Sequence, residues 1–219
     1  LVAGATLSAL EGRPEPEVTG AGAASSRPSL DDFLAPELIR PTLRALLKKL
    51  PSVLDNAYTV DLKALRSGPL PPEHADLGGE IRTIAESMGI RSLELLVSPA
   101  LGSAAIAASC APARIVLGTG LLEGDDDAAR YFSLVRALKI IQGHAAALTR
   151  IAPIDLWPAT AALLGALAPS FQAQGVDAAK LGDARRRIDA ALPSRRDEEF
   201  ATLALEVGGG RREDAHVDR

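Results

Sequence analysis

The segment SLELLVSPALGSAAIAASCAPARIVLGT, which covers Ser92–Thr119, decides the fold class of this chain. Its first part, Ser92–Ser98, alternates as a strand does, and its last part, Ala113–Thr119, is a short apolar run with branched side chains. The middle part, SAAIAAS, is a weaker strand candidate. Proline and glycine separate the three parts. We therefore predict a small sheet of about three strands joined by short turns.

Helical patterns lie on both sides of this segment. Leucines at helical spacing run through residues 29–50, and a second apolar stripe runs through 71–90, where Gly89 is a stop signal. After the strands, three aspartates at 125–127 precede a long helix predicted over 126–149, because acidic side chains stabilise the positive end of a helix macrodipole. On its buried side we expect Phe132, Val135, Leu138, Ile141 and Leu148. Further helices are predicted near 158–167, 176–192 and 194–206.

Together these patterns predict an α+β fold that is mostly helical. We expect a flexible linker at 1–28, which is rich in Gly, Pro, Ala and Ser, then a folded domain at 29–207. A flexible tail is expected at 208–219, which opens with glycines. The first residue is Leu, so we expect a fragment or processed product of a larger, bacterial-type protein. The alternative fold, a purely helical scaffold, predicts no sheet at 92–118.

The composition excludes several classes of function. Only 3% of the residues are aromatic although 47% are hydrophobic, so the core must consist of Ala, Leu, Ile and Val. The formal net charge is −4 and the short arginine clusters alternate with acids, so we expect no nucleic-acid partner. Cys110 is the only cysteine, which excludes an internal disulfide and a cysteine-based zinc cluster. No apolar run reaches the ~18–20 residues of a membrane span, and we expect a soluble, cytoplasmic protein.

A family resemblance rests on the order of the elements and on two motifs. A helix and strands lead to IVLGTGLLEG at 115–124, and the long helix that follows contains a glycine–histidine step at 143–144. This order resembles the HtpX-like zinc metallopeptidases over roughly residues 75–150. The resemblance implies a zincin-type fold whose long helix would carry the H-E-x-x-H motif. At the motif's positions this chain has Ile140, Ile141, Gln142, Gly143 and His144.

The chemistry of the resembled family depends on the side chains that are missing here. Two histidines four residues apart on a helix bind the zinc ion, and the glutamate beside the first is the general base for the zinc-bound water. Ile140 replaces the first ligand and Ile141 replaces the base, so only His144 remains. We therefore expect a degenerate zincin-type domain with no catalytic residue and no cofactor. Such a pseudo-peptidase would serve as a structural or protein-interaction module, with the former substrate cleft beside these residues as its groove.

A rearranged zinc site is the alternative. In the resembled family a later E-x-x-x-D motif supplies a third ligand, and Asp214 begins a similar D-x-x-x-D here. Together with His144 and His216, Asp214 would make a three-ligand set for zinc. This alternative predicts an active zinc metallopeptidase that binds one zinc ion through His144.

The partner expected for a non-catalytic domain is another protein. The most apolar region of the chain, 149–171, contains Trp157, which is the only tryptophan, and Phe171. Core packing is one interpretation of these two aromatic side chains. A partner-binding surface is the other, because tryptophan is enriched at interface hot spots.

Overall fold

The computed structural model describes residues 41–192 and 198–214, which all lie in one of two compact units of the chain, Ile39–Arg219. The predicted linker at 1–28, the beginning of the first predicted helix and residues 215–219, which include His216, lie outside the described residues.

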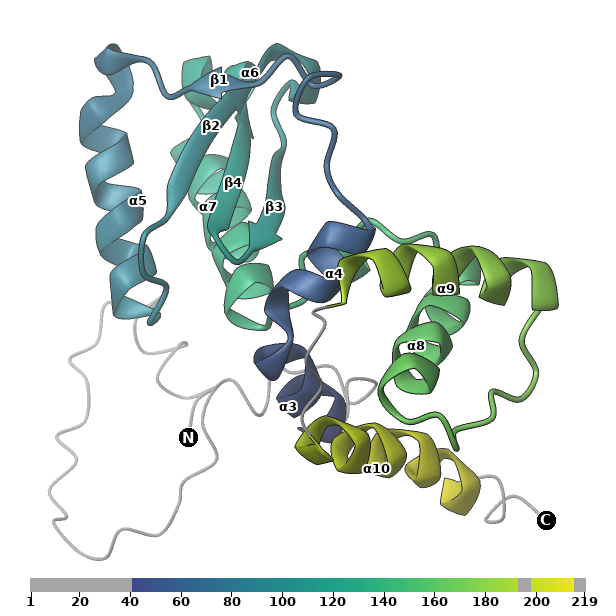
Figure 1. Cartoon of the computed structure of the whole chain (residues 1–219). Coiled ribbons are helices and arrows are strands. Elements are labelled where there is room, and N and C mark those ends of the chain that lie inside the picture. The colour runs from purple at the N-terminus through teal and green to yellow at the C-terminus, as the bar shows by residue number, and fades with distance from the viewer. Residues whose placement is uncertain (1–40, 193–197, 215–219) are drawn as a thin grey trace, which may run out of the picture. The chain divides into compact units, whose positions relative to one another are not determined.

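One small mixed sheet is visible in Figure 1, with the strand order β1-β2-β4-β3. Its strands are β1 (Gly68–Pro69), β2 (Glu94–Ser98), β3 (Ala105–Cys110) and β4 (Ala113–Gly118). β2 and β4 are parallel, while β1 is antiparallel to β2 and β3 is antiparallel to β4. The three predicted strands are therefore confirmed, and their pairing eliminates the purely helical scaffold. β1 was missed because two residues carry no periodicity.

The first hydrophobic core joins the sheet to two helices, α5 (Ala75–Ser87) and α7 (Asp127–Gln142). In the parallel pair, Leu95 is in register with Ile115 and Val97 with Leu117. These four side chains share one face of the sheet because side chains alternate along a strand. They are buried in the same cluster as the inward-facing residues of α5 and α7.

The connection after β4 depends on a glycine. β4 leads directly into the short helix α6 (Thr119–Glu123), and the turn η2 (Pro99–Leu101) lies beside it. A Cβ atom at Gly118 would lie 1.9 Å from the carbonyl oxygen of Gly102, so only glycine permits this approach of the two backbones. The GTG sequence at 118–120 is therefore explained by the packing of the chain.

A second hydrophobic core consists of helices alone. The largest fully buried side chains in it are Leu46, Val53, Leu163, Leu164 and Ile188. Its helices are α3 (Pro41–Lys49), α4 (Pro51–Ala57), α8 (Pro153–Leu167), α9 (Ala178–Ala191) and α10 (Glu198–Asp214). The remaining short turns are η1 (Pro72–His74) and η3 (Ala147–Thr149). The described part of the chain is thus mostly helical with one small sheet, as predicted, and no described helix is long and apolar enough to cross a membrane.

The structure differs from the predictions at three points. The long helix ends at Gln142 and a short turn, η3, follows, whereas one helix was predicted through residue 149. Phe132 was placed on the buried side of that helix but is 68% exposed, because Leu134, Ala137, Leu138 and Ile141 form its buried side. Finally, α10 continues to Asp214, whereas the last helix was predicted to end at residue 206.

Candidate functional site

Residues 140–144, which the resemblance aligns with the H-E-x-x-H motif, lie at the C-terminal end of α7 (Asp127–Gln142). Ile141 is only 2% exposed and belongs to the first hydrophobic core, between the sheet and the two helices. Ile140 is partly buried and packs against the same core. The two isoleucines that the resemblance aligns with a zinc ligand and a general base therefore stabilise the fold.

His144 does not lie within the helix but caps its C-terminus. The amide of His144 donates to the carbonyl of Ile141 at 2.9 Å, and the amide of Ala145 donates to the carbonyl of Ile140 at 3.0 Å. These two bonds, together with a φ of 53° at His144, define a Schellman motif. In H-E-x-x-H both histidines are helical, one turn apart on one face. Residues 140 and 144 do not have that relation here, because the chain leaves the helix between them.

The imidazole of His144 sits in an environment that opposes positive charge. Burial lowers its pKa and the nearby ammonium group of Lys48 lowers it further, while the carboxylate of Asp55 acts in the opposite direction. Its Nδ1 atom is buried and has no hydrogen-bond partner among the residues that the structure describes. His144 is therefore a largely neutral, incompletely satisfied imidazole at physiological pH.

A zinc site at His144 would need further ligands beside its imidazole. Within 41–192 and 198–214, no three His, Cys, Asp or Glu side chains are grouped so that they could hold a metal. The positive charge of Lys48 beside His144 would also repel a cation. The backbone of Asp214 ends α10, but its side chain and the whole of His216 lie outside the described structure. The zinc set of His144, Asp214 and His216 thus gains no support from the part of it that is described.

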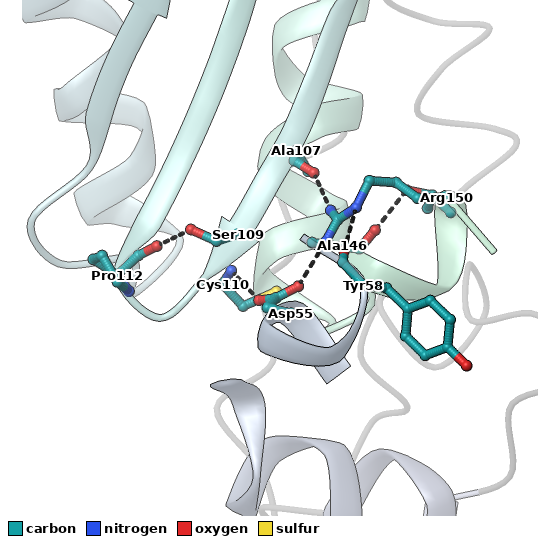
Figure 2. A network of polar contacts seen from close by, with 9 residues as sticks. Asp55, Tyr58, Ala107, Ser109, Cys110, Pro112, Ala146 and Arg150 are labelled. Carbon is teal, nitrogen blue, oxygen red and sulfur yellow. Dashed lines mark hydrogen bonds and ion pairs between the residues drawn. The ribbon is translucent and has the colours of Figure 1, made fainter. Parts of the chain in front are cut away.

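A buried polar network, which no sequence pattern predicted, lies where the two cores meet (Figure 2). Asp55, on α4, is 4% exposed at its side chain, and its Oδ1 pairs with Nη2 of Arg150 at 3.2 Å. Its other oxygen accepts the backbone N–H of Cys110, on β3, at 2.6 Å. Arg150 also donates to the carbonyl oxygens of Tyr58 and Ala107, at 2.9 Å each. The network therefore ties α4 and the chain after η3 to the edge strand of the sheet.

Cys110 belongs to this network, and its thiol is hard to ionise. Burial and the negative charge of Asp55 raise the pKa of Cys110 to about 12, and the Arg150 charge only partly offsets this. The thiolate is the nucleophilic form of cysteine, and at neutral pH almost none of it is present here. Cys110 is therefore poorly suited to act as a nucleophile.

A cleft of about 360 Å³ lies beside the network, between Arg150 and the helices α8 and α9. Lys180 pairs with Asp155 at its wall, with the nitrogen and oxygen 2.6 Å apart. The guanidinium carbon of Arg187 lies 5.5 Å from the centre of the Tyr58 ring, a cation–π arrangement. The cleft therefore contains charged groups that already interact with other groups of the protein.

The two aromatic residues proposed for a partner surface contact each other. The rings of Trp157 and Phe171 meet edge to face, with centroids 6.5 Å apart, and both side chains are partly buried. Trp157 donates its indole N–H to the carbonyl of Gln174 at 3.0 Å, and Phe171 packs against the second core. Among the aromatic residues that the structure describes, Tyr131 and Phe132 on α7 are the most exposed, at 54% and 68%. The exposure of Phe132 was missed because the buried side of α7 was predicted from spacing alone.

Comparison with known proteins found no match for this chain. No protein-family model, curated protein or solved structure matches the chain. The function must therefore be argued from the residues and their surroundings.

Proposed function

We propose that this chain is a non-catalytic, pseudo-peptidase domain that serves as a protein-interaction module. The observation that carries the proposal is the burial of Ile141, which occupies the position of the general base within the core of the fold. An apolar side chain there cannot accept a proton from water, and it contributes to stability by filling space between α7 and the sheet.

Two further features support the non-catalytic half of the proposal. The helix ends before His144, so an imidazole at this position does not face residue 140 across one helical turn. The only cysteine is held as a thiol by Asp55 and by burial, which argues against a cysteine nucleophile.

The interaction half of the proposal rests on the surface of α7. The chain has few aromatic residues, at 3% of the total, yet Tyr131 and Phe132 are neighbours and both are more than half exposed. Large apolar side chains that remain exposed together are typical of surfaces that bind other proteins.

Zinc content and hydrolysis test the proposal. The full chain, purified without chelator and dialysed against micromolar zinc, is expected to retain no stoichiometric zinc by elemental analysis. It is also expected to show no chelator-sensitive cleavage of a fluorescent casein. The His144→Ala variant is the matched control, and it should behave as the wild type does in both measurements. One zinc per chain that disappears in His144→Ala would overturn the non-catalytic assignment and favour the rearranged zinc site.

A further inference from the structure

We infer that a groove between α5 and α7 binds a cationic amphipathic helix of a partner protein, an inference that rests on the proposed interaction function. The groove has a volume of about 220 Å³ and is lined by residues of both helices. Three of its lining side chains, Leu77, Ile81 and Ile84, recur along α5 at helical spacing. The groove therefore presents an apolar strip that runs along a helix axis.

The apolar strip is only partly covered by the protein itself. Ile81 is buried, whereas Leu77 and Ile84 are partly exposed, and Tyr131 from α7 completes the wall with 54% of its surface exposed. An amphipathic helix can place apolar side chains at i, i+3, i+4 and i+7 into such a strip. Tyrosine at the wall offers a rigid apolar ring with a polar tip, which suits an interface anchor.

The charged residues near the groove indicate which sign of charge the partner helix carries. Segments 72–87 and 119–131, which contain α5 and the start of α7, hold eight Asp or Glu residues and two arginines, although the whole chain has a net charge of only −4. Three charged side chains, Glu80, Asp127 and Arg130, line the groove itself, and Asp127 pairs with Arg130 on the same helix, which leaves the acid Glu80 without a basic partner in the lining. The segments that form the groove therefore carry more acids than bases, with Glu80 in the lining, and lysine or arginine on the polar face of the partner helix would complement this acidic excess.

Binding of designed helical peptides tests this inference. The probe is a fluorescein-labelled peptide of about 18 residues, made of Leu and Lys, with the leucines on one helical face. Its fluorescence anisotropy is titrated with the full chain at about 100 mM NaCl. A Leu/Glu peptide with the same leucine pattern tests the charge requirement. A Leu/Lys peptide of the same composition without a leucine face tests the shape requirement. We expect both controls to bind at least about ten-fold more weakly than the probe.

Variants of the protein locate the binding site. Tyr131→Ala and Glu80→Lys are each expected to raise the Kd of the Leu/Lys peptide by about ten-fold or more. Glu86→Lys is the matched control for charge, because it makes the same change on the same helix outside the groove lining. Ile154→Ala, at a residue that is 71% exposed on α8, is the matched control for lost apolar surface. Both controls should stay within about two-fold of the wild type.

Three outcomes would overturn the groove as the binding site. These are no binding of the Leu/Lys peptide, equal binding of the Leu/Glu peptide, and equal effects of Glu86→Lys and Glu80→Lys. Circular dichroism of each variant excludes unfolding as the cause of a lost signal. Failure of this inference is distinguishable from failure of the non-catalytic assignment, because that assignment is decided by zinc content and hydrolysis and not by peptide binding.

Discussion

Replacement of Asp55 by alanine is expected to destabilise the protein more than replacement of any surface acid. Asp55 neutralises Arg150 and accepts the amide of Cys110, and its side chain is 4% exposed. Removing one partner of a buried ion pair typically costs about 3–5 kcal/mol, because the other charge stays buried without compensation. The unsatisfied Cys110 amide adds roughly 1–3 kcal/mol.

Two features reduce that cost. The Arg150 side chain keeps 18% exposure and retains its bonds to the carbonyls of Tyr58 and Ala107 after the substitution. We therefore expect Asp55→Ala to lower the free energy of unfolding by about 3–4 kcal/mol. This is a large fraction of the roughly 5–15 kcal/mol that stabilises a typical domain.

Urea unfolding followed by far-ultraviolet circular dichroism measures this change. For an m-value of about 2 kcal/mol/M, the midpoint should fall by roughly 1.5–2 M. Asp183→Ala is the matched control, because Asp183 pairs with Arg186 on the surface of α9 and such pairs contribute about 0–1 kcal/mol. The double variant Asp55→Ala, Arg150→Met should recover part of the loss, because it leaves no uncompensated charge. A loss below about 1 kcal/mol, or one equal to that of Asp183→Ala, would refute the assignment of this pair as a stabilising junction.

Two further predictions concern titratable groups of the same region. Because the pKa of Cys110 is raised from 9.0 to about 12, its thiolate fraction near neutral pH is about 10³-fold lower than in the unfolded chain. Its reaction with an aromatic disulfide reagent should therefore be much slower in the folded protein, and Asp55→Asn should accelerate it; an equal rate in folded and urea-unfolded protein would contradict this. The pKa of His144 is lowered from 6.5 by burial and by Lys48, so below that pH the unfolded chain binds a proton that the folded chain does not. The unfolding free energy should accordingly decrease between about pH 7 and about pH 5, and His144→Gln should lessen that decrease. An unchanged pH dependence in this variant would show that other groups cause it.

Local patterns in the sequence were sufficient for most of the secondary structure. The strands predicted at 92–98, 103–109 and 113–119 are observed at 94–98, 105–110 and 113–118, because alternation, branched residues and breakers act over a few neighbouring positions. The start of α7 was predicted for a similar reason, since Asp126 accepts the amide of Ala129 as a side-chain cap. The end of α7 had a local signal too, in Gly143, but the prediction carried the helix past it.

Contacts between distant residues were decided by the tertiary structure alone. Asp55 and Arg150 are 95 residues apart, and neither belongs to a motif that predicts an ion pair. β1 exists only because β2 offers an edge to two residues that have no pattern of their own. The exposure of Phe132 depends on which face of α7 meets the sheet, and spacing along one helix does not determine that rotation.

The sequence by itself therefore determined which segments are strands and helices, and it determined that an isoleucine, Ile141, stands three residues before His144. Only the tertiary structure decided that this isoleucine is a core residue, that His144 lies outside the helix, and that Glu80, Asp127 and Arg130 lie beside apolar side chains in a groove between α5 and α7. The physical reason is the separation along the chain over which each interaction acts. Hydrogen bonds and side-chain alternation within an element act between near neighbours, whereas burial and electrostatic environment depend on segments that folding brings together.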